Sequence, residues 1–385
     1  MTAIYEQPSL WQRAIKPIFT GFDGPLALAI VLLAATGMVT MYSVGFDQGS
    51  RFVDHGRNML IAATLMFLVA QVPTHRLMAL AVPLYAVALA LLIATALFGI
   101  TKKGATRWLN VGMVIQPSEM MKMAMPLMLA WWFQKCEGQL RLPEFLVAGA
   151  LLLVPVFLVA RQPDLGTAIL VLAAGMYVIF FAGLSWKLIA PVVVVAGVAI
   201  VALILAQDNI CQADVEWPML RAYQKQRVCT LLDPTQDPLG KGFHIIQGMI
   251  AIGSGGLTGK GFMQGTQTHL EFIPERTTDF IFASFSEEFG MVGTVSLLLG
   301  FTFLILRGLV IAHQAPTLFG RLLAGAISLS FFTYAFVNMG MVSGILPVVG
   351  IPLPFISYGG TAMVTLGLGL GILMSIAKSR RLMQS

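Results

Sequence analysis

Apolar stretches long enough to cross a membrane recur along the whole chain, and this feature limits the fold more than any other. The hydrocarbon core of a bilayer is about 30 Å thick, a distance that takes about 20 apolar residues in a helix. Because backbone polar groups need partners inside lipid, a chain with many such stretches folds as a bundle of membrane helices. The composition agrees, since 57% of the residues are hydrophobic and 11% are charged, unlike a soluble globular domain.

The sequence therefore predicts an all-α polytopic membrane protein with about ten transmembrane helices. No repeat or linker divides the chain, so residues 1–385 are predicted to form a single integral membrane domain. The predicted spans lie at residues 24–44, 57–72, 77–99, 115–134, 143–160, 165–184, 188–206, 279–307, 321–345 and 358–377.

The placement of Lys and Arg predicts the orientation of these spans. An even number of spans puts both termini on one side of the membrane. Counting the basic residues of the tails and short loops gives eleven on that side and six on the other. Cytoplasmic loops carry the excess of basic residues, so both termini are predicted to be cytoplasmic. One long extracytoplasmic loop, at about 207–278, then precedes the eighth helix.

This long loop is predicted to be functional, because loops of its length are rarely simple connectors. Ten of the 18 acidic residues lie between Asp208 and Glu288. The segment HIIQGMIAIG indicates ordered structure at the membrane surface, and its Gln247 is a candidate for lining a cavity. Cys211 and Cys229 also fall in the loop, where disulfides persist. They form either a disulfide or two unpaired thiols, and nothing in the sequence fixes their separation.

The glycine-rich segment GSGGLTGKG, at 253–261, invites a phosphate-loop interpretation, which fails. A Walker loop ending at Lys260 requires Gly at position 254 and Ser or Thr at position 261, but the chain has Ser254 and Gly261. The better interpretation is a turn in which backbone runs close to backbone.

Two ionisable residues lie inside the fourth predicted span. Glu119 and Lys122 are three residues apart in QPSEMMKMAM, so they share one helix face. Charged groups inside a membrane are costly and usually mark a polar cavity or a functional path. The alternative is a self-neutralising pair that lets the helix insert.

Basic residues also gather at the predicted outer surface. The segment GITKKGATRWLN carries Lys102, Lys103 and Arg107. Arg is suited to bind phosphate through two hydrogen bonds, so these cations would fit the headgroup of an anionic lipid. The alternative is that they are ordinary interfacial anchors. Arg161 and Asp164, in ARQPDLGTA, are candidates for ligands or for helix caps.

Two further segments indicate a cavity that opens outward. The stretch GILPVVGIPLPFISYGG, at 344–360, has a backbone broken by proline and glycine, and such backbone survives at membrane depth where it lines a cavity. In EFIPERTTDFIFASFSEEFG, Asp279 is expected in the first turn of a helix capped by Thr277 or Thr278. Glu287 lies eight residues later, roughly 12 Å along a helix, so Asp279 and Glu287 form no carboxylate dyad.

Four of these motifs, in this order, resemble the SEDS family (shape, elongation, division and sporulation). They are RQPDLGTAIL, LLDPTQDPLGKGFHIIQGMIAIGSGGLTGKG, HLEFIPERTTDFIFASFSEEFG and GILPVVGIPLPFISYGG. The resemblance implies a peptidoglycan glycosyltransferase of the bacterial cytoplasmic membrane, which polymerises lipid II on the outer face during cell-wall elongation. It implies Asp279 as the catalytic carboxylate and a Glu119–Lys122 pair in the core.

The resemblance also implies partners and a cofactor. The partners are lipid II, a class B penicillin-binding protein that crosslinks the product, and other elongation-complex proteins, with no nucleic acid. A divalent cation, Mg or Mn, is expected by resemblance alone, because no set of ligands has a recognisable spacing. No nucleotide is expected.

The chemistry that the resemblance implies needs one carboxylate. A base takes the proton of the acceptor hydroxyl, and pyrophosphate leaves as an anion without a second acid. Glu287 and Glu288 are then interpreted as structural or partner-facing. The alternative function is a lipid-linked precursor flippase or another transporter, which broken helices and an intramembrane ion pair also suit. A scaffold that only positions a penicillin-binding protein would leave the polar core unexplained.

Overall fold

The structure, a computed structural model, describes residues 22–47, 49–102, 105–110, 112, 114–138, 141–212, 215, 222–236, 240–273 and 275–384. This part of the chain is mostly helical, as predicted. The long helices are α3 (Gly24–Val44), α4 (Gly49–Ala70), α5 (Thr74–Phe98), α6 (Pro117–Lys135), α7 (Leu142–Arg161), α8 (Leu165–Phe181), α9 (Trp186–Leu205), α14 (Ile281–Gln314), α15 (Leu318–Val342) and α16 (Gly360–Gln384). The shorter helices are α10 (Gln207–Ile210), α11 (Ala222–Leu232), η1 (Pro234–Gln236), α12 (Lys241–Ser254) and α13 (Thr266–His269).

Each of the ten predicted spans falls on one of the ten long helices. Seven of them, within the described part of the chain, are long and apolar enough to cross a membrane: α3, α5, α7, α9, α14, α15 and α16. The other three are α4 and α6, which carry charged residues, and α8, which has 17 residues. The length and apolar composition of these helices indicate that the chain is a multi-pass membrane protein.

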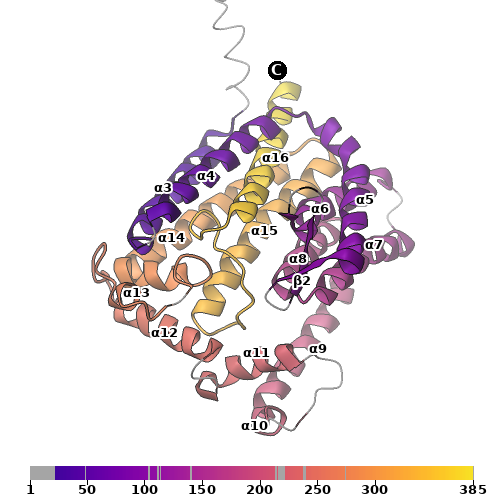
Figure 1. The fold of residues 1–385 in the computed structure, drawn as a ribbon. Coiled ribbons are helices and arrows are strands. Elements are labelled where there is room, and N and C mark those ends of the chain that lie inside the picture. Colours follow the sequence, from indigo (N-terminus) through magenta and orange to yellow (C-terminus); the bar gives the residue numbers. More distant parts are fainter. Residues whose placement is uncertain are drawn as a thin grey trace, which may run out of the picture.

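Helices α15 and α16 lie at the centre of the bundle and α9 lies at its margin (Figure 1). Most residues of α15 are buried, and it packs against α14, α8 and α6. Helix α16 packs mainly against α4. Helix α9 buries none of its residues although it is very apolar. The polar groups of the candidate site gather around the central helices.

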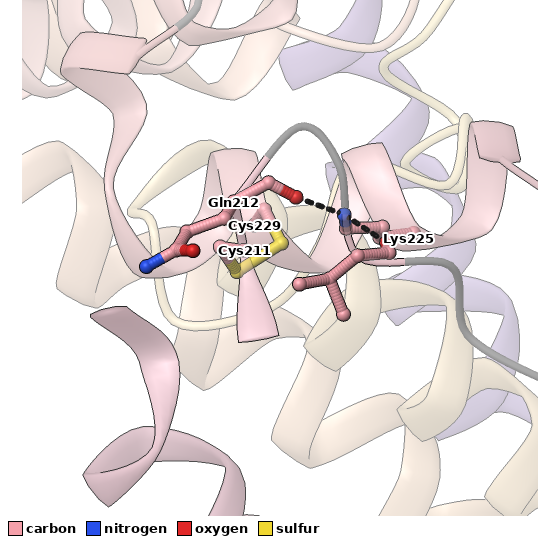
Figure 2. The surroundings of a disulfide bond; sticks show 5 residues. Cys211, Gln212, Lys225 and Cys229 are labelled. Carbon is pink, nitrogen blue, oxygen red and sulfur yellow. Dashed lines mark hydrogen bonds between the residues drawn. A yellow bond between two sulfur atoms is a disulfide. The ribbon is translucent and has the colours of Figure 1, made fainter. Parts of the chain in front are cut away.

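The segments of the long loop lie at one end of the bundle, opposite the C-terminal end of α16 (Figure 1). Cys211 and Cys229 form a disulfide there, which decides between the two alternatives that the sequence left open. The Lys225 ammonium donates hydrogen bonds to the carbonyl oxygens of Gln212, at 2.5 Å, and Val215, at 2.6 Å (Figure 2). The chain after α10 is thus fastened to α11.

A small antiparallel sheet precedes α6 and corrects the all-α prediction. Its strands are β1 (Ile100–Lys102), β2 (Ala105–Asn110) and β3 (Val114–Ile115), in the order β1-β2-β3. Thr101 pairs with Thr106, and Leu109 pairs with Ile115. The β-branched and aromatic residues of this segment favour a pleated, half-buried surface. The sheet places Arg107, on β2, beside the start of α8.

Helix α14 is broken near its start, and the glycine-rich loop fills the break. Gly290 has φ 62° and ψ −160°, a conformation that only glycine adopts readily. The loop supplies hydrogen bonds to both sides of the break. The Lys260 and Gly261 amides donate to the Glu287 and Glu288 carbonyls, each at 3.0 Å, and the Met291 amide donates to the Gly256 carbonyl at 2.9 Å.

Small residues are required in this loop because it touches the helix backbone. A Cβ at Gly255 or Gly259 would overlap the carbonyl oxygens of Ser286 and Glu288, respectively. The interpretation of 253–261 as a turn where backbone meets backbone is confirmed. We call residues 255–261 the splint of α14.

Candidate active site

Asp279 lies in a turn, residues 275–280, that immediately precedes α14. The helix begins at Ile281 with Phe280 as its N-cap, and no side chain caps it. The expectation that Asp279 occupies the first helical turn under a Thr277 or Thr278 cap is therefore wrong. The turn is closed internally instead, because the amides of Thr278 and Phe280 both donate to the Glu275 carbonyl at 3.1 Å. Asp279 thus belongs to a compact turn that is only partly exposed.

Three consecutive carbonyl oxygens of this turn accept hydrogen bonds from the chain between 338 and 358. The Tyr358 amide donates to Thr277 at 2.8 Å, the Ser357 hydroxyl to Thr278 at 2.7 Å, and the Asn338 amide group to Asp279 at 3.0 Å. The broken stretch 344–360 thus supplies two of these three contacts, and α15 supplies the third.

Arg276 anchors the other side of the turn to the end of α3. Its side chain is 7% exposed and forms ion pairs with Asp47, at 2.5 Å, and Glu271, at 3.4 Å. It also donates to the Val44 carbonyl at 3.3 Å and lies over the ring of Phe46. A guanidinium with several donors in a fixed plane suits such a junction.

The pKa of the Asp47 carboxyl is held below its usual value by this junction. The hydrogen bond from Arg276 is the largest cause, and the positive charge of Arg276 acts in the same direction. Asp47 therefore stays ionised under ordinary conditions.

Arg51 is a site residue that the sequence analysis did not single out. It lies on α4, donates a hydrogen bond to the Thr277 hydroxyl and stacks over the Tyr358 ring, 5.3 Å from its centroid. Its signal in the sequence is weak, since it is one basic residue in a segment predicted as a short loop between the first two spans. Its contacts place a cation next to the Asp279 turn.

Arg107 forms a second polar cluster with the start of α8. Its guanidinium donates to the Pro163 carbonyl at 2.5 Å and lies 3.9 Å from the Asp164 carboxylate. Asp164 accepts from the Gln116 side chain at 2.9 Å and caps α8 through the Thr167 amide at 3.2 Å. Of the two alternatives that the sequence left open for Asp164, the structure shows the helix cap. Arg107 remains 31% exposed and thus has room for a further ligand.

The broken stretch brings the two clusters to the same region. The Val349 carbonyl lies against Gly166, in the first turn of α8, where an added Cβ would be 2.8 Å away. At the next residue, an added Cβ on Gly350 would be 3.2 Å from Asp279 Oδ2. Residues 349 and 350 therefore separate the Asp164 cap of α8 from the Asp279 carboxylate.

Glu119 and Lys122 pair inside the bundle, as predicted from their spacing. Their charged atoms are 2.6 Å apart, and the Lys122 side chain is 6% exposed. The Thr365 hydroxyl, on α16, donates to the second Glu119 oxygen at 3.2 Å. The Lys122 ammonium lies 5.5 Å from the centroid of the Tyr334 ring on α15. The pair thus joins α6 to both central helices.

Comparison with known proteins identifies the family to which this geometry belongs. The family model of the cell cycle proteins FtsW, RodA and SpoVE matches residues 25–382. The chain belongs to this family. The resemblance to the SEDS proteins, and among them to the rod-shape-determining protein RodA, is confirmed.

Relatives with assigned names match almost end to end. The chain is 46% identical over 361 residues to a protein of Escherichia coli named peptidoglycan glycosyltransferase MrdB, and the match covers 93% of this chain and 94% of the relative. It is 32% identical to a protein of Treponema pallidum named peptidoglycan glycosyltransferase RodA, with coverages of 92% and 97%.

Solved structures share the fold. One chain of a structure described as the coordination of polymerization and crosslinking by a peptidoglycan synthase complex superposes with a TM-score of 0.75 at 31% identity, covering 93% of this chain and 98% of the other. The crystal structure of the rod shape determining protein RodA of Thermus thermophilus gives 0.67 at 26% identity, with coverages of 94% and 98%.

Arg161, Gln247 and Lys103 are the remaining candidates of this FtsW, RodA and SpoVE family member. Arg161 is exposed at the end of α7, and its guanidinium lies over the Phe157 ring. Gln247 is partly buried on α12, next to Gly248, which packs against Phe280. Lys103 lies outside the described residues. Arg107 and Arg161, both candidates for substrate binding, therefore have different surroundings.

Glu287 and Glu288 fasten the long loop to α14. Glu287 is fully buried, pairs with Lys260 at 2.7 Å and accepts the Gln267 amide at 2.9 Å. Glu288 accepts the Ser43 hydroxyl of α3 at 2.6 Å. These contacts agree with the structural role predicted for both glutamates.

A divalent cation remains a prediction from resemblance. Across the part of the chain that the structure describes, no group of three or more His, Cys, Asp and Glu side chains is arranged to hold a metal ion. The reaction proposed below is therefore written with protein groups, and the cation stays an expectation.

Proposed function

We propose that the chain is a peptidoglycan glycosyltransferase that polymerises lipid II into β-1,4 glycan strands during cell-wall elongation. The observation that carries the proposal is the 46% identity, over 93% of the chain, to a protein named peptidoglycan glycosyltransferase. The geometry supports it, because a carboxylate lies in a turn whose main chain is held on two sides.

In the proposed reaction, Asp279 is the general base. Its carboxylate takes the proton from the 4-hydroxyl of an acceptor GlcNAc, and the oxygen attacks the anomeric carbon of MurNAc in a second lipid II. The new C–O bond forms as the bond to the pyrophosphate oxygen breaks, with inversion at the anomeric carbon. A positioned base typically contributes about 10²–10⁴ in rate.

The leaving group, undecaprenyl pyrophosphate, departs as an anion and needs positive charge rather than a proton. Arg107 suits this task because its guanidinium is partly exposed and is oriented by Pro163 and Asp164. Arg51, which contacts Thr277, is a second cation beside the Asp279 turn. A pyrophosphate binds well to a guanidinium through paired hydrogen bonds.

The proposed topology is ten spans in a single domain, with both termini in the cytoplasm and the active site outside the bacterial inner membrane. The ten long helices match the predicted spans, and the distribution of basic residues favours this orientation. The Cys211–Cys229 disulfide supports an outside location for the long loop, because disulfides persist in oxidising compartments.

The proposed partner is a class B penicillin-binding protein that crosslinks the glycan product, together with other proteins of the elongation complex. One of the similar solved structures is a peptidoglycan synthase complex that coordinates polymerization and crosslinking. A polymerase and a crosslinking enzyme act on the same strand, so their association is chemically sensible.

The proposal is tested by incubating lipid II with purified wild-type protein and with Asp279→Asn. Asn keeps the size of Asp but cannot accept the proton, so glycan strands should fall below about 1% of the wild-type yield. Glu271→Gln is the control, because Glu271 is a nearby exposed carboxylate and its amide variant still has an acceptor for Arg276. Thermal unfolding and co-purification of the penicillin-binding protein report the fold.

Substantial polymer from Asp279→Asn would remove this residue from the mechanism and favour the transporter hypothesis. An Asp279→Asn protein that is unfolded, or that loses its partner, would instead indicate a structural role.

A further inference from the structure

Asn338 connects the Asp279 turn with the broken stretch through one amide group. The residue lies on α15 and is completely buried. Its side-chain nitrogen donates to the carbonyl oxygens of Asp279, at 3.0 Å, and Ile351, at 2.7 Å. An amide nitrogen carries two protons, so both are used. The Asn338 side chain therefore holds the main chain of Asp279 and the segment around Gly350. The Asp279 carboxylate faces that segment.

Ser357 makes the second connection of this kind. It is 2% exposed. Its hydroxyl donates to the Thr278 carbonyl at 2.7 Å and accepts from the Leu353 amide at 2.8 Å. A hydroxyl has one proton to donate and can also accept a hydrogen bond. Ser357 can therefore bind the Leu353 amide of its own loop and the Thr278 carbonyl of the turn at the same time.

These contacts, together with those of Arg276, Arg51 and the Tyr358 amide, place the turn, because it lacks regular secondary structure. Its internal hydrogen bonds to Glu275 fix its shape but not its place relative to the helices. A shift of about 1 Å in a catalytic group can cost about 10² in rate. Since Asn338 and Ser357 are buried, neither is placed to touch a substrate.

We infer that Asn338 and Ser357 are positioning residues that set the location of the Asp279 carboxylate by holding the carbonyl oxygens of Thr278 and Asp279. This inference rests on the proposed role of Asp279 as the base. It assigns to the two side chains an effect on turnover rather than on substrate binding.

The test measures initial rates of glycan formation against lipid II concentration for purified variants. Ser357→Ala should lower kcat about tenfold, and Asn338→Leu about a hundredfold, with KM within threefold of wild type. Ser357→Thr keeps the hydroxyl and should restore most of kcat. Asn338→Asp keeps the size but has no amide protons, so it should resemble Asn338→Leu.

Ser343→Ala is the matched control. Ser343 is the C-cap of α15, and its hydroxyl donates a hydrogen bond to the Met339 carbonyl of that helix at 2.7 Å. Its loss should leave kcat within twofold of wild type. Thermal unfolding is measured for every variant, and Ser357→Ala keeps the test open if Asn338→Leu does not fold.

If Asp279→Asn is inactive in the same assay, two results would overturn this inference and leave the proposed function standing. One is unchanged kcat in both Ser357→Ala and Asn338→Leu. The other is a joint loss of melting temperature and kcat in Ser357→Ala that Ser357→Thr does not restore, which indicates a general packing role. Activity in Asp279→Asn would overturn the inference together with the proposed function.

Discussion

The Glu119–Lys122 pair and the Asp279 turn both place polar groups among membrane helices, but they are stabilised in opposite ways. In the pair, two side chains neutralise each other at 2.6 Å. In the turn, the described hydrogen bonds from Tyr358, Ser357 and Asn338 reach the main chain.

Under the proposed function, this difference separates a charge that stabilises the fold from a charge that takes part in the reaction. An ion pair satisfies the charged atoms themselves, which suits a junction between helices. Hydrogen bonds to carbonyl oxygens hold the main chain of a residue, which suits a residue whose position matters to a reaction. Substitutions in the ion pair and around the turn test this contrast. The substitution with the largest expected effect comes first.

Removing Lys122 alone should have the largest effect on stability. In Lys122→Ala the Glu119 carboxylate stays buried without its partner, which should lower the free energy of unfolding by about 3–5 kcal/mol. The double variant Glu119→Gln/Lys122→Met removes both charges and should recover most of this loss. Thermal unfolding in detergent measures both. A double variant as unstable as the single one would show that the pair is not held by charge.

Arg276→Met should weaken the anchor of the turn while leaving the bundle folded. Hydrogen bonds to charged groups contribute about 1.5–3 kcal/mol, so we expect a loss of about 2 kcal/mol in stability and at least tenfold in polymerisation. Arg276→Lys keeps the charge but not the planar fork and should be intermediate. The control is Arg57→Met, because Arg57 pairs with Asp54 but is 65% exposed. Equal losses from the two Met variants would contradict a special role for Arg276.

Arg107→Ala and Arg161→Ala distinguish a leaving-group contact from an interfacial anchor. The two residues flank the same outer surface in the sequence, but Arg107 contacts Asp164 and Arg161 contacts Phe157. Arg107→Ala should lower the polymerisation rate about tenfold with little change in melting temperature, because in the proposed mechanism its charge stabilises the departing pyrophosphate. Arg161→Ala should retain wild-type activity. Matching losses would assign both residues to membrane anchoring.

The smallest effect concerns the pH dependence of the Arg276 junction. The pKa of Asp47 is below its unfolded value of 3.8, so the folded state binds fewer protons near that pH. The stabilisation is therefore complete above about pH 4 and is lost as pH falls through the lowered folded pKa. Melting temperatures of wild type and Asp47→Asn should differ at pH 6 and converge towards pH 3. A difference that persists unchanged at pH 3 would exclude ionisation of Asp47 as its cause.

The sequence was sufficient for the helices and for residues that act through local spacing. The length of the apolar stretches located all ten long helices. The start of α4 was predicted at residue 57, but the helix begins at Gly49. The prediction was late because the first turns of α4 carry Arg51 and other polar residues. The Glu119–Lys122 pair followed from helical periodicity. Asp279 followed from a family motif, but its helix starts later than capping preferences predicted.

The residues that hold the site were not predictable, because their partners are distant in the chain. Asn338 and Ser357 bind carbonyl groups 59 and 79 residues away, and a carbonyl group leaves no trace in the sequence. Asn338 did carry a signal, since an amide inside an apolar span is costly without partners. The β1–β3 sheet was missed because its strands are short and follow an apolar helix.

The splint of α14 has a consequence for how the protein is made. Residues 255–261 leave the ribosome before Gly290, so the segment that completes the broken helix is synthesised ahead of the helix itself. Under the proposed topology, this segment must cross the membrane before α14 can dock against it. The part of α14 that precedes Gly290, together with the Asp279 turn, is then among the last segments to reach its final position. Variants that slow translocation of the long loop should accumulate protein whose membrane helices are inserted but whose active site is unassembled.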